Sequence, residues 1–124
     1  MNRSREQIKI DFKKPGFDGL ICMFHFMDNG HHIAYMPSLN LTGYGDSEEE
    51  AKELLMDHVV KDFLDGLFTL PKSQIVEELK KLGWEKSQFF DKEFSKSYVD
   101  IDGVLREFNL PAETKIESQL MAVA

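Results

Sequence analysis

Apolar and polar residues alternate near the start of the chain in the pattern of a half-buried strand. Residues 8–12 read Ile-Lys-Ile-Asp-Phe, so their apolar side chains fall on one face. The Pro-Gly step at residues 15–16 then interrupts the pattern. Residues 20–27 are almost wholly apolar, which predicts a central strand with both faces in contact.

A hairpin turn is predicted at residues 29–30, because Asn-Gly favours the type I′ geometry that matches strand twist. In that register Phe26 lies opposite Ile33, and Phe24 lies opposite Tyr35. One face of the hairpin then carries Cys22, Phe24, Phe26, Ile33 and Tyr35, and the other carries Met23, His25, Met27, His32, Ala34 and Met36.

The segment after this hairpin predicts a passage from strand to helix. Pro37 ends the second hairpin strand. Leu39 and Leu41 mark a short further strand, and Gly43 and Gly45 favour a turn after it.

A long helix is predicted from about Ser47 to Leu67. Ser47 and Glu50 form an S-x-x-E capping box, and three consecutive glutamates suit the positive end of a helix dipole. The apolar positions form a stripe broad enough to lie across a sheet: Ala51, Leu54, Leu55, Met56, Val59, Val60, Phe63, Leu64 and Leu67.

A second helix of about ten residues is predicted from the Leu-Pro step at residues 70–71 through Leu82. Its inward positions are Ile75, Val76, Leu79 and Leu82. Gly83 suits the left-handed position that ends a helix, and Trp84 can pack back on the last turn.

The C-terminal part of the chain is less regular. Residues 85–97 fit strand or helix equally well. Asp102-Gly103 favours a hairpin turn between strands at residues 98–101 and 104–108. Residues 116–123 are predicted to form a strand or a short helix, with strand preferred.

The charge of the chain narrows the class of partner. With 22 acidic and 15 basic residues, its formal net charge is −7, whereas nucleic-acid binders carry a basic footprint. We therefore expect no direct nucleic-acid contact, and an acidic surface favours a basic protein partner.

Cys22 is the only cysteine, which fits a reducing compartment. The sequence shows neither a signal peptide nor an apolar run of membrane-spanning length, so we expect a cytoplasmic protein without membrane contact.

The histidines are the first candidates for a metal site. His25 and His32 share one face of the predicted hairpin, and Asp28 and His31 lie close in its turn. No spacing fixes a third ligand, however, and polar tips on the less buried face of a hairpin explain the same pattern. We expect no metal and no cofactor here. His58 borders the apolar stripe of the long helix and is expected to be a core-edge histidine.

No catalytic residue is predicted. Cys22 lies among aromatic residues with no basic neighbour to activate it, and Ser38 and Ser47 lack a G-x-S-x-G elbow. The one enzymatic alternative is a metal-dependent nuclease. Its conceivable carboxylates are Asp11, Asp28 and Asp46, each of which also has a simpler structural role.

Two short stretches resemble the core motif of the HicB-like antitoxin family. They are Y-x-P-x-L at residues 35–39 and G-D-S-x-E-E-A at residues 45–51, and the resemblance covers roughly residues 19–67. It implies three antiparallel strands leading through a Gly-Asp-Ser turn into an amphipathic helix, in a partial ribonuclease-H-like fold. It also implies a small basic ribonuclease as partner. Residues 98–124 hold only two basic residues, so the DNA-binding module of many family members is not expected here.

The expectation is therefore a single α+β domain over residues 1–124, with a C-terminal extension from about residue 70. A mostly antiparallel sheet of four to six strands carries the long helix, and open sheet edges favour a homodimer. The function expected is a non-catalytic, antitoxin-like protein-binding module. The alternative is a stand-alone cytoplasmic domain on the same fold that binds another ligand.

Overall fold

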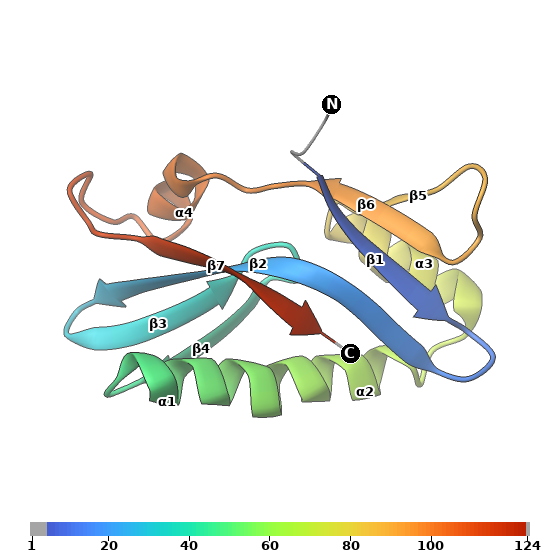
Figure 1. Cartoon of the computed structure of the whole chain (residues 1–124), viewed down its shortest axis with the longest axis horizontal. Helices are drawn as coiled ribbons and strands as arrows, with labels where there is room; N and C mark the ends of the chain where they lie inside the picture. Colours follow the sequence, from blue (N-terminus) through green and yellow to red (C-terminus); the bar gives the residue numbers. More distant parts are fainter. Residues whose placement is uncertain (1–4, 124) are drawn as a thin grey trace.

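The computed structural model describes residues 5–123 and has an α+β fold (Figure 1). All strand pairs in this part of the chain are antiparallel, and they join seven strands into one sheet. The strands are β1 (Arg5–Asp11), β2 (Gly16–Asp28), β3 (His31–Met36), β4 (Leu41–Gly45), β5 (Glu85–Lys86), β6 (Glu93–Ser97) and β7 (Glu117–Val123). The helices are α1 (Glu48–Glu53), the π-helical η1 (Leu54–Val59), α2 (Val60–Leu67), α3 (Lys72–Lys81) and α4 (Ile101–Glu107). The sheet is thus larger than the four to six strands expected.

The central strand β2 has a forked arrangement of neighbours. Leu20 pairs with both Gln7 of β1 and Ala122 of β7, so β1 and β7 lie on opposite edges of β2. His25 pairs with both Ala34 of β3 and Glu117 of β7, so β3 also lies opposite β7. Strands β1 and β3 therefore share one edge of β2, end to end. Beyond them, β4 extends one branch of the sheet, while β6 and β5 extend the other.

The predicted hairpin between β2 and β3 is confirmed residue by residue. Phe26 pairs with Ile33, and Phe24 pairs with Tyr35. The turn residues Asn29 and Gly30 have positive φ angles of 52° and 81°, as a type I′ turn requires.

The expectation that the histidine face of this hairpin is the less buried one is wrong. Met23, Ala34 and Met36 on that face are fully buried in the main core. The reason is that the long helix covers this face, and a single hairpin does not reveal which side the helix takes. His25 consequently lies at the margin of the core and is 8% exposed.

One continuous helix over Glu48–Leu67 packs against β3 and β4, as predicted (Figure 1). Its buried residues are Ala51, Leu55, Val60 and Leu67. The π-helical stretch η1 was not predicted. There the N–H of Val60 donates to the carbonyl of Leu55, one residue further back than in an α-helix.

The expected turn at Gly43 and Gly45 is wrong, because both glycines lie inside β4. The chain reverses earlier, at residues 37–40, where Asn40 has a φ of 54°. The glycines serve instead to admit the helix. A Cβ atom on Gly43 would lie 2.5 Å from the carbonyl oxygen of Ala51 and 2.7 Å from the backbone nitrogen of Leu55. Strand and helix backbones thus approach more closely than any side chain would allow.

Helix α3 confirms the second helix prediction and closes the main core under the other branch of the sheet. Ile75 and Leu79 are buried, and Gly83 ends the helix with a φ of 98°. Trp84 is 1% exposed, and its indole N–H donates to the carbonyl of Ser38 at 2.9 Å.

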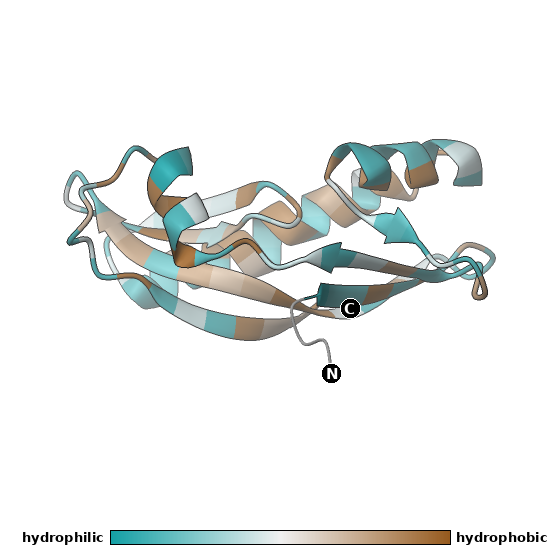
Figure 2. Ribbon diagram, turned by 90° about the horizontal axis from the view of Figure 1, so that it is seen from above, coloured by the Kyte–Doolittle hydropathy of each residue, from teal (hydrophilic) through white to brown (hydrophobic). Residues whose placement is uncertain are grey.

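The predicted hairpin around Asp102-Gly103 is wrong, because this segment forms helix α4. Asp100 caps the helix by accepting the N–H of Gly103 at 2.8 Å. The helix places Val104 and Phe108 on Phe26 and Tyr35, and forms a second small core on the outer face of the β2–β3 hairpin. In Figure 2 hydrophobic and hydrophilic segments alternate along the helices, as expected where one side of each helix packs on the sheet.

The remaining C-terminal segments form strands. Within residues 85–97, whose sequence fits strand or helix, β5 and β6 form and Phe94 is buried, whereas Phe89 and Phe90 are exposed. The predicted strand at residues 116–123 is confirmed as β7. No helix within residues 5–123 combines the length and apolar character needed to cross a membrane.

A polar cluster at the junction of the sheet and the long helix

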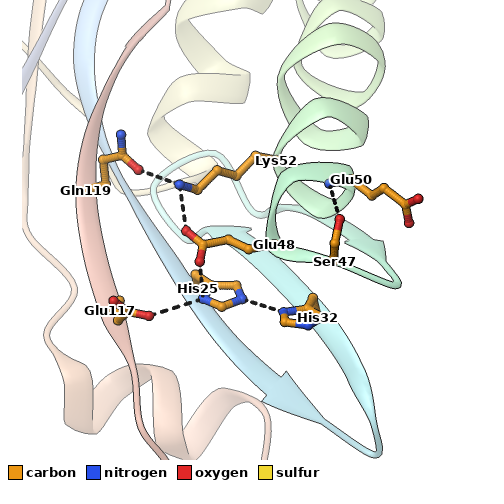
Figure 3. Close-up of polar contacts among 8 residues, drawn as sticks. All are labelled: His25, His32, Ser47, Glu48, Glu50, Lys52, Glu117 and Gln119. Carbon is orange, nitrogen blue, oxygen red and sulfur yellow. Dashed lines mark hydrogen bonds and ion pairs between the residues drawn. The ribbon is translucent and has the colours of Figure 1, made fainter.

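Polar side chains gather where β2, β3, β7 and the first turn of α1 meet (Figure 3). His25 of β2 is the direct cross-strand partner of Glu117 in β7. His32 of β3 lies diagonally across the hairpin, because His25 itself pairs with Ala34. Glu48, the first residue of α1, completes the cluster from the helix side.

The capping structure of α1 fixes the position of Glu48. Ser47 accepts the N–H of Glu50 at 3.0 Å, as the capping box predicts. In a capping box the glutamate side chain accepts the N–H of the N-cap residue, which here is Ser47. The Glu50 carboxylate instead accepts the N–H of the preceding residue, Asp46, at 2.8 Å. Both bonds hold the first turn in place, so Glu48 starts the helix directly above the sheet.

The two histidine rings are nearly parallel and are joined by a hydrogen bond. Their centroids lie 5.1 Å apart with an interplanar angle of 10°. His25 Nε2 lies 2.9 Å from His32 Nδ1, so one of these nitrogens carries the shared proton. This bond fixes the orientation of the His25 ring.

The second ring nitrogen of His25 points at two carboxylates. His25 Nδ1 lies 3.6 Å from Oε1 of Glu48 and 3.6 Å from Oε1 of Glu117. Both separations are too long for a hydrogen bond. His25 Nδ1 is buried and has no hydrogen-bond partner among residues 5–123, which is uncommon for a polar atom in a folded protein.

Lys52 orients Glu48 from the opposite side. Its Nζ lies 2.8 Å from Oε2 of Glu48 and 2.9 Å from Oε1 of Gln119. The hydrogen bond from Lys52 is the main cause that lowers the pKa of Glu48 below its ordinary value, so this carboxylate is ionised at neutral pH. The cluster lines a pocket of about 150 Å³.

The sequence candidates for a metal site are only partly brought together. His25 and His32 meet as their register predicts, but the carboxylates beside His25 are Glu48 and Glu117 rather than Asp28. Asp28 and His31 face each other at the far end of the hairpin. The sequence assigns Glu48 only to the start of the helix, and nothing local in the sequence links it to Glu117.

One other expectation from the sequence is wrong. His58 is exposed rather than at the edge of the core, because the π-helical stretch shifts the buried face of the helix.

The carboxylates considered for a metal-dependent nuclease are not brought together. Asp11 pairs with Gly16 at the start of β2, whereas Asp28 is the last residue of β2, about 40 Å away at the rise of an extended strand. Asp11 instead accepts the N–H groups of Lys13 and Lys14 in the first turn.

Glu6 is a buried carboxyl group that the sequence analysis missed. It is 1% exposed, accepts the N–H of Cys22 at 2.8 Å, and also accepts the hydroxyl of Ser38. Burial raises its pKa above the ordinary value. Burial, and then the charge of Glu6, raises the pKa of Cys22 to about 11, so this thiol is protonated at neutral pH.

A hollow of about 470 Å³ opens on the outer face of the sheet, beside α4. Its lining is Cys22, Phe24, Tyr98, Val99, Asp100, Ile101, Asp102 and Ser118. Ile101 lines the hollow and is 46% exposed. Leu120 pairs with Cys22 across the strands, and Leu20 lies two residues before Cys22 in β2, so both share its face of the sheet. Leu120 and Leu20 are 52% and 55% exposed. Strand β7 borders this surface and pairs only with β2 among the described strands. We call the lining of this hollow, together with Leu20 and Leu120, the outer patch.

Searches of protein-family models, of curated proteins and of solved structures find no match to this chain. The described residues themselves define an α+β domain with two separate features of interest. These are the polar cluster around His25 and the outer patch beside β7.

Proposed function

We propose that this chain is a non-catalytic protein-binding module on a HicB-like, partial ribonuclease-H-like scaffold, and that it binds a small basic protein as an antitoxin-type domain does. The observation that carries the proposal is the outer patch. Apolar side chains about half exposed lie there beside a strand whose second edge is unpaired within residues 5–123. Exposed apolar surface next to a free strand edge is typical of protein-binding sites.

The charge of the outer patch supports a basic partner. The charged side chains that line its hollow are Asp100 and Asp102, and the whole chain carries a formal net charge of −7. A partner with an apolar anchor flanked by lysine or arginine would fill the hollow and pair with these aspartates.

The order of elements also supports the family likeness. Strands β2, β3 and β4 form an antiparallel unit, and Gly45-Asp46-Ser47 leads from the last strand into the amphipathic helix. This is the arrangement that the resemblance implies for residues 19–67.

The test is direct binding between purified proteins. A basic protein of fewer than about 100 residues would be captured from source cells at physiological salt, purified and titrated against this chain by calorimetry. We expect a nanomolar complex that weakens as salt rises. Leu120→Glu should weaken it at least about tenfold, since it places a charge in the outer patch.

Phe89→Glu supplies the matched control. Phe89 is 86% exposed but lies outside the outer patch, so this variant should bind as the native chain does. The proposal is wrong if no small basic protein binds, or if Phe89→Glu weakens the complex and Leu120→Glu does not.

A further inference from the structure

The unsatisfied ring nitrogen of His25 points to a ligand that the protein atoms do not supply. The His25 side chain is 10% exposed, and its Nδ1 has no hydrogen-bond partner within residues 5–123. It faces two carboxylate oxygens at equal distances of 3.6 Å. A buried nitrogen between two anionic oxygens is the environment that a cation stabilises.

The spacing of these three atoms matches a small coordination sphere. Zinc binds nitrogen and oxygen ligands at about 2.0–2.2 Å in tetrahedral geometry, which places neighbouring ligand atoms about 3.3 Å apart. His25 Nδ1 is a few tenths of an ångström further than this from each glutamate oxygen. The three ligand atoms all lie within 4.8 Å of one another. Small side-chain adjustments would therefore complete the contacts.

Hydrogen bonds from neighbouring side chains orient the candidate ligands, as residues that bond to metal ligands do around known metal sites. If His25 donates its Nε2–H to His32, its Nδ1 carries a free lone pair directed at the two carboxylates. Lys52 binds the other oxygen of Glu48 and leaves Oε1 directed at His25. The lysine also balances one of the two negative charges, so a divalent ion would leave the cluster with a single net positive charge.

We propose that His25, Glu48 and Glu117 form a binding site for one divalent transition-metal ion of the zinc class. Each ligand comes from a different element, namely β2, α1 and β7. Three protein ligands leave a fourth position for water or an exogenous ligand, and the pocket of about 150 Å³ has room for it.

Metal titration of the full chain tests the proposal. Chelator-treated protein would be titrated with zinc by calorimetry and with cobalt(II) by visible absorption, which reports tetrahedral coordination. We expect one zinc ion per chain. Changing even an outer partner of a metal ligand costs about 10–100-fold in affinity, so Glu117→Gln should lower zinc affinity by about 100-fold or more. His32→Phe keeps an aromatic ring and removes the hydrogen bond, so a loss of about tenfold is expected.

Matched controls separate this site from adventitious binding. Glu113→Gln makes the same charge change at an exposed position outside the cluster. His31→Ala removes an exposed histidine that is adjacent to His32 in the chain. Both variants should bind zinc as the native chain does. An unchanged amide spectrum would show that Glu117→Gln is folded. The proposal is overturned if the native chain takes up no zinc, if Glu117→Gln binds zinc as tightly as the native chain, or if His31→Ala abolishes zinc binding.

Discussion

The carboxyl group of Glu6 occupies a position that a backbone carbonyl would fill in an uninterrupted sheet. It accepts the N–H of Cys22 where β3 ends and β1 begins, and it also accepts the hydroxyl of Ser38. Leaving either donor buried without a partner would cost about 1–3 kcal/mol. Glu6 therefore supplies a hydrogen-bond acceptor for the N–H of Cys22, which has no backbone partner where the sheet forks.

The raised pKa of Glu6 predicts a pH-dependent stability. Folding favours the protonated carboxyl, so its stabilising contribution is present below the ordinary pKa of 4.5 and is lost as pH rises through the raised folded-state pKa. Glu6→Gln stays neutral and can still serve both partners. As the pH rises above 4.5, the free energy of unfolding measured by urea titration should therefore fall less for Glu6→Gln than for the native chain. Parallel curves for the two proteins would contradict this.

Gly43 and Gly66 should respond in opposite ways to alanine. A Cβ at Gly43 would meet helix backbone atoms at 2.5 and 2.7 Å, whereas a Cβ at Gly66 would meet nothing within 4 Å. We expect Gly43→Ala to destabilise the fold by about 1–3 kcal/mol. Gly66→Ala lies within α2 and should stabilise it by about 0.5–1 kcal/mol. Chemical denaturation measures both, and a neutral Gly43→Ala would show that the helix can shift away.

At the scale of elements, α4 depends on the cap at Asp100. The Asp100 carboxylate accepts the N–H of Gly103 at 2.8 Å, and the helix covers Phe26 and Tyr35 through Phe108. Asp100→Ala should therefore destabilise the protein by about 1 kcal/mol. Asp102→Ala, in the same first turn, should cost less, and thermal unfolding compares the two. Equal effects would mean that charge near the helix start matters more than the cap.

The elements that the sequence predicted are those whose signals are local. Asn29-Gly30 fixes the register of its hairpin, and Ser47 with Glu50 marks the start of the long helix. Asp102-Gly103 is ambiguous, because Asp-Gly fits both a hairpin turn and the first turn of a helix capped by Asp100. Glu6 had a usable signal, since it continues the inward alternation of Ile8 and Ile10. The pairing of β7 with β2 had none, and this pairing is what brings Glu117 to His25.

At the scale of the whole molecule, the fork divides the sheet into two branches that share only β2. One branch carries β3, β4 and the long helix, and the other carries β1, β6, β5 and α3. The outer edge of β7 is unpaired within residues 5–123 and holds no charged residue from Ser118 to Val123. Unprotected edges of this kind pair readily with other strands.

The homodimer expected from open edges therefore stays a prediction, with the β7 edge as its interface in the absence of the basic partner, which would compete for the same edge. Light scattering after size exclusion should give twice the mass of 14.3 kDa at micromolar concentrations. Leu120→Glu should give the monomer mass, and Phe89→Glu should remain dimeric. A monomeric native chain would leave the β7 edge to a partner of another kind.

The π-helical stretch has a consequence for how this chain tolerates changes in length. A π turn holds one residue more than the α-helical turn it replaces. Deleting the exposed Asp57 from η1 should therefore restore a regular α-helix and leave Leu55 and Leu67 on their buried sides. Deleting the exposed Asp62 from α2 would instead turn Leu67 away from the core by about 100°. Unfolding measurements should find the first deletion mild and the second severe, so that η1 is the place where this helix can lose a residue and keep its packing.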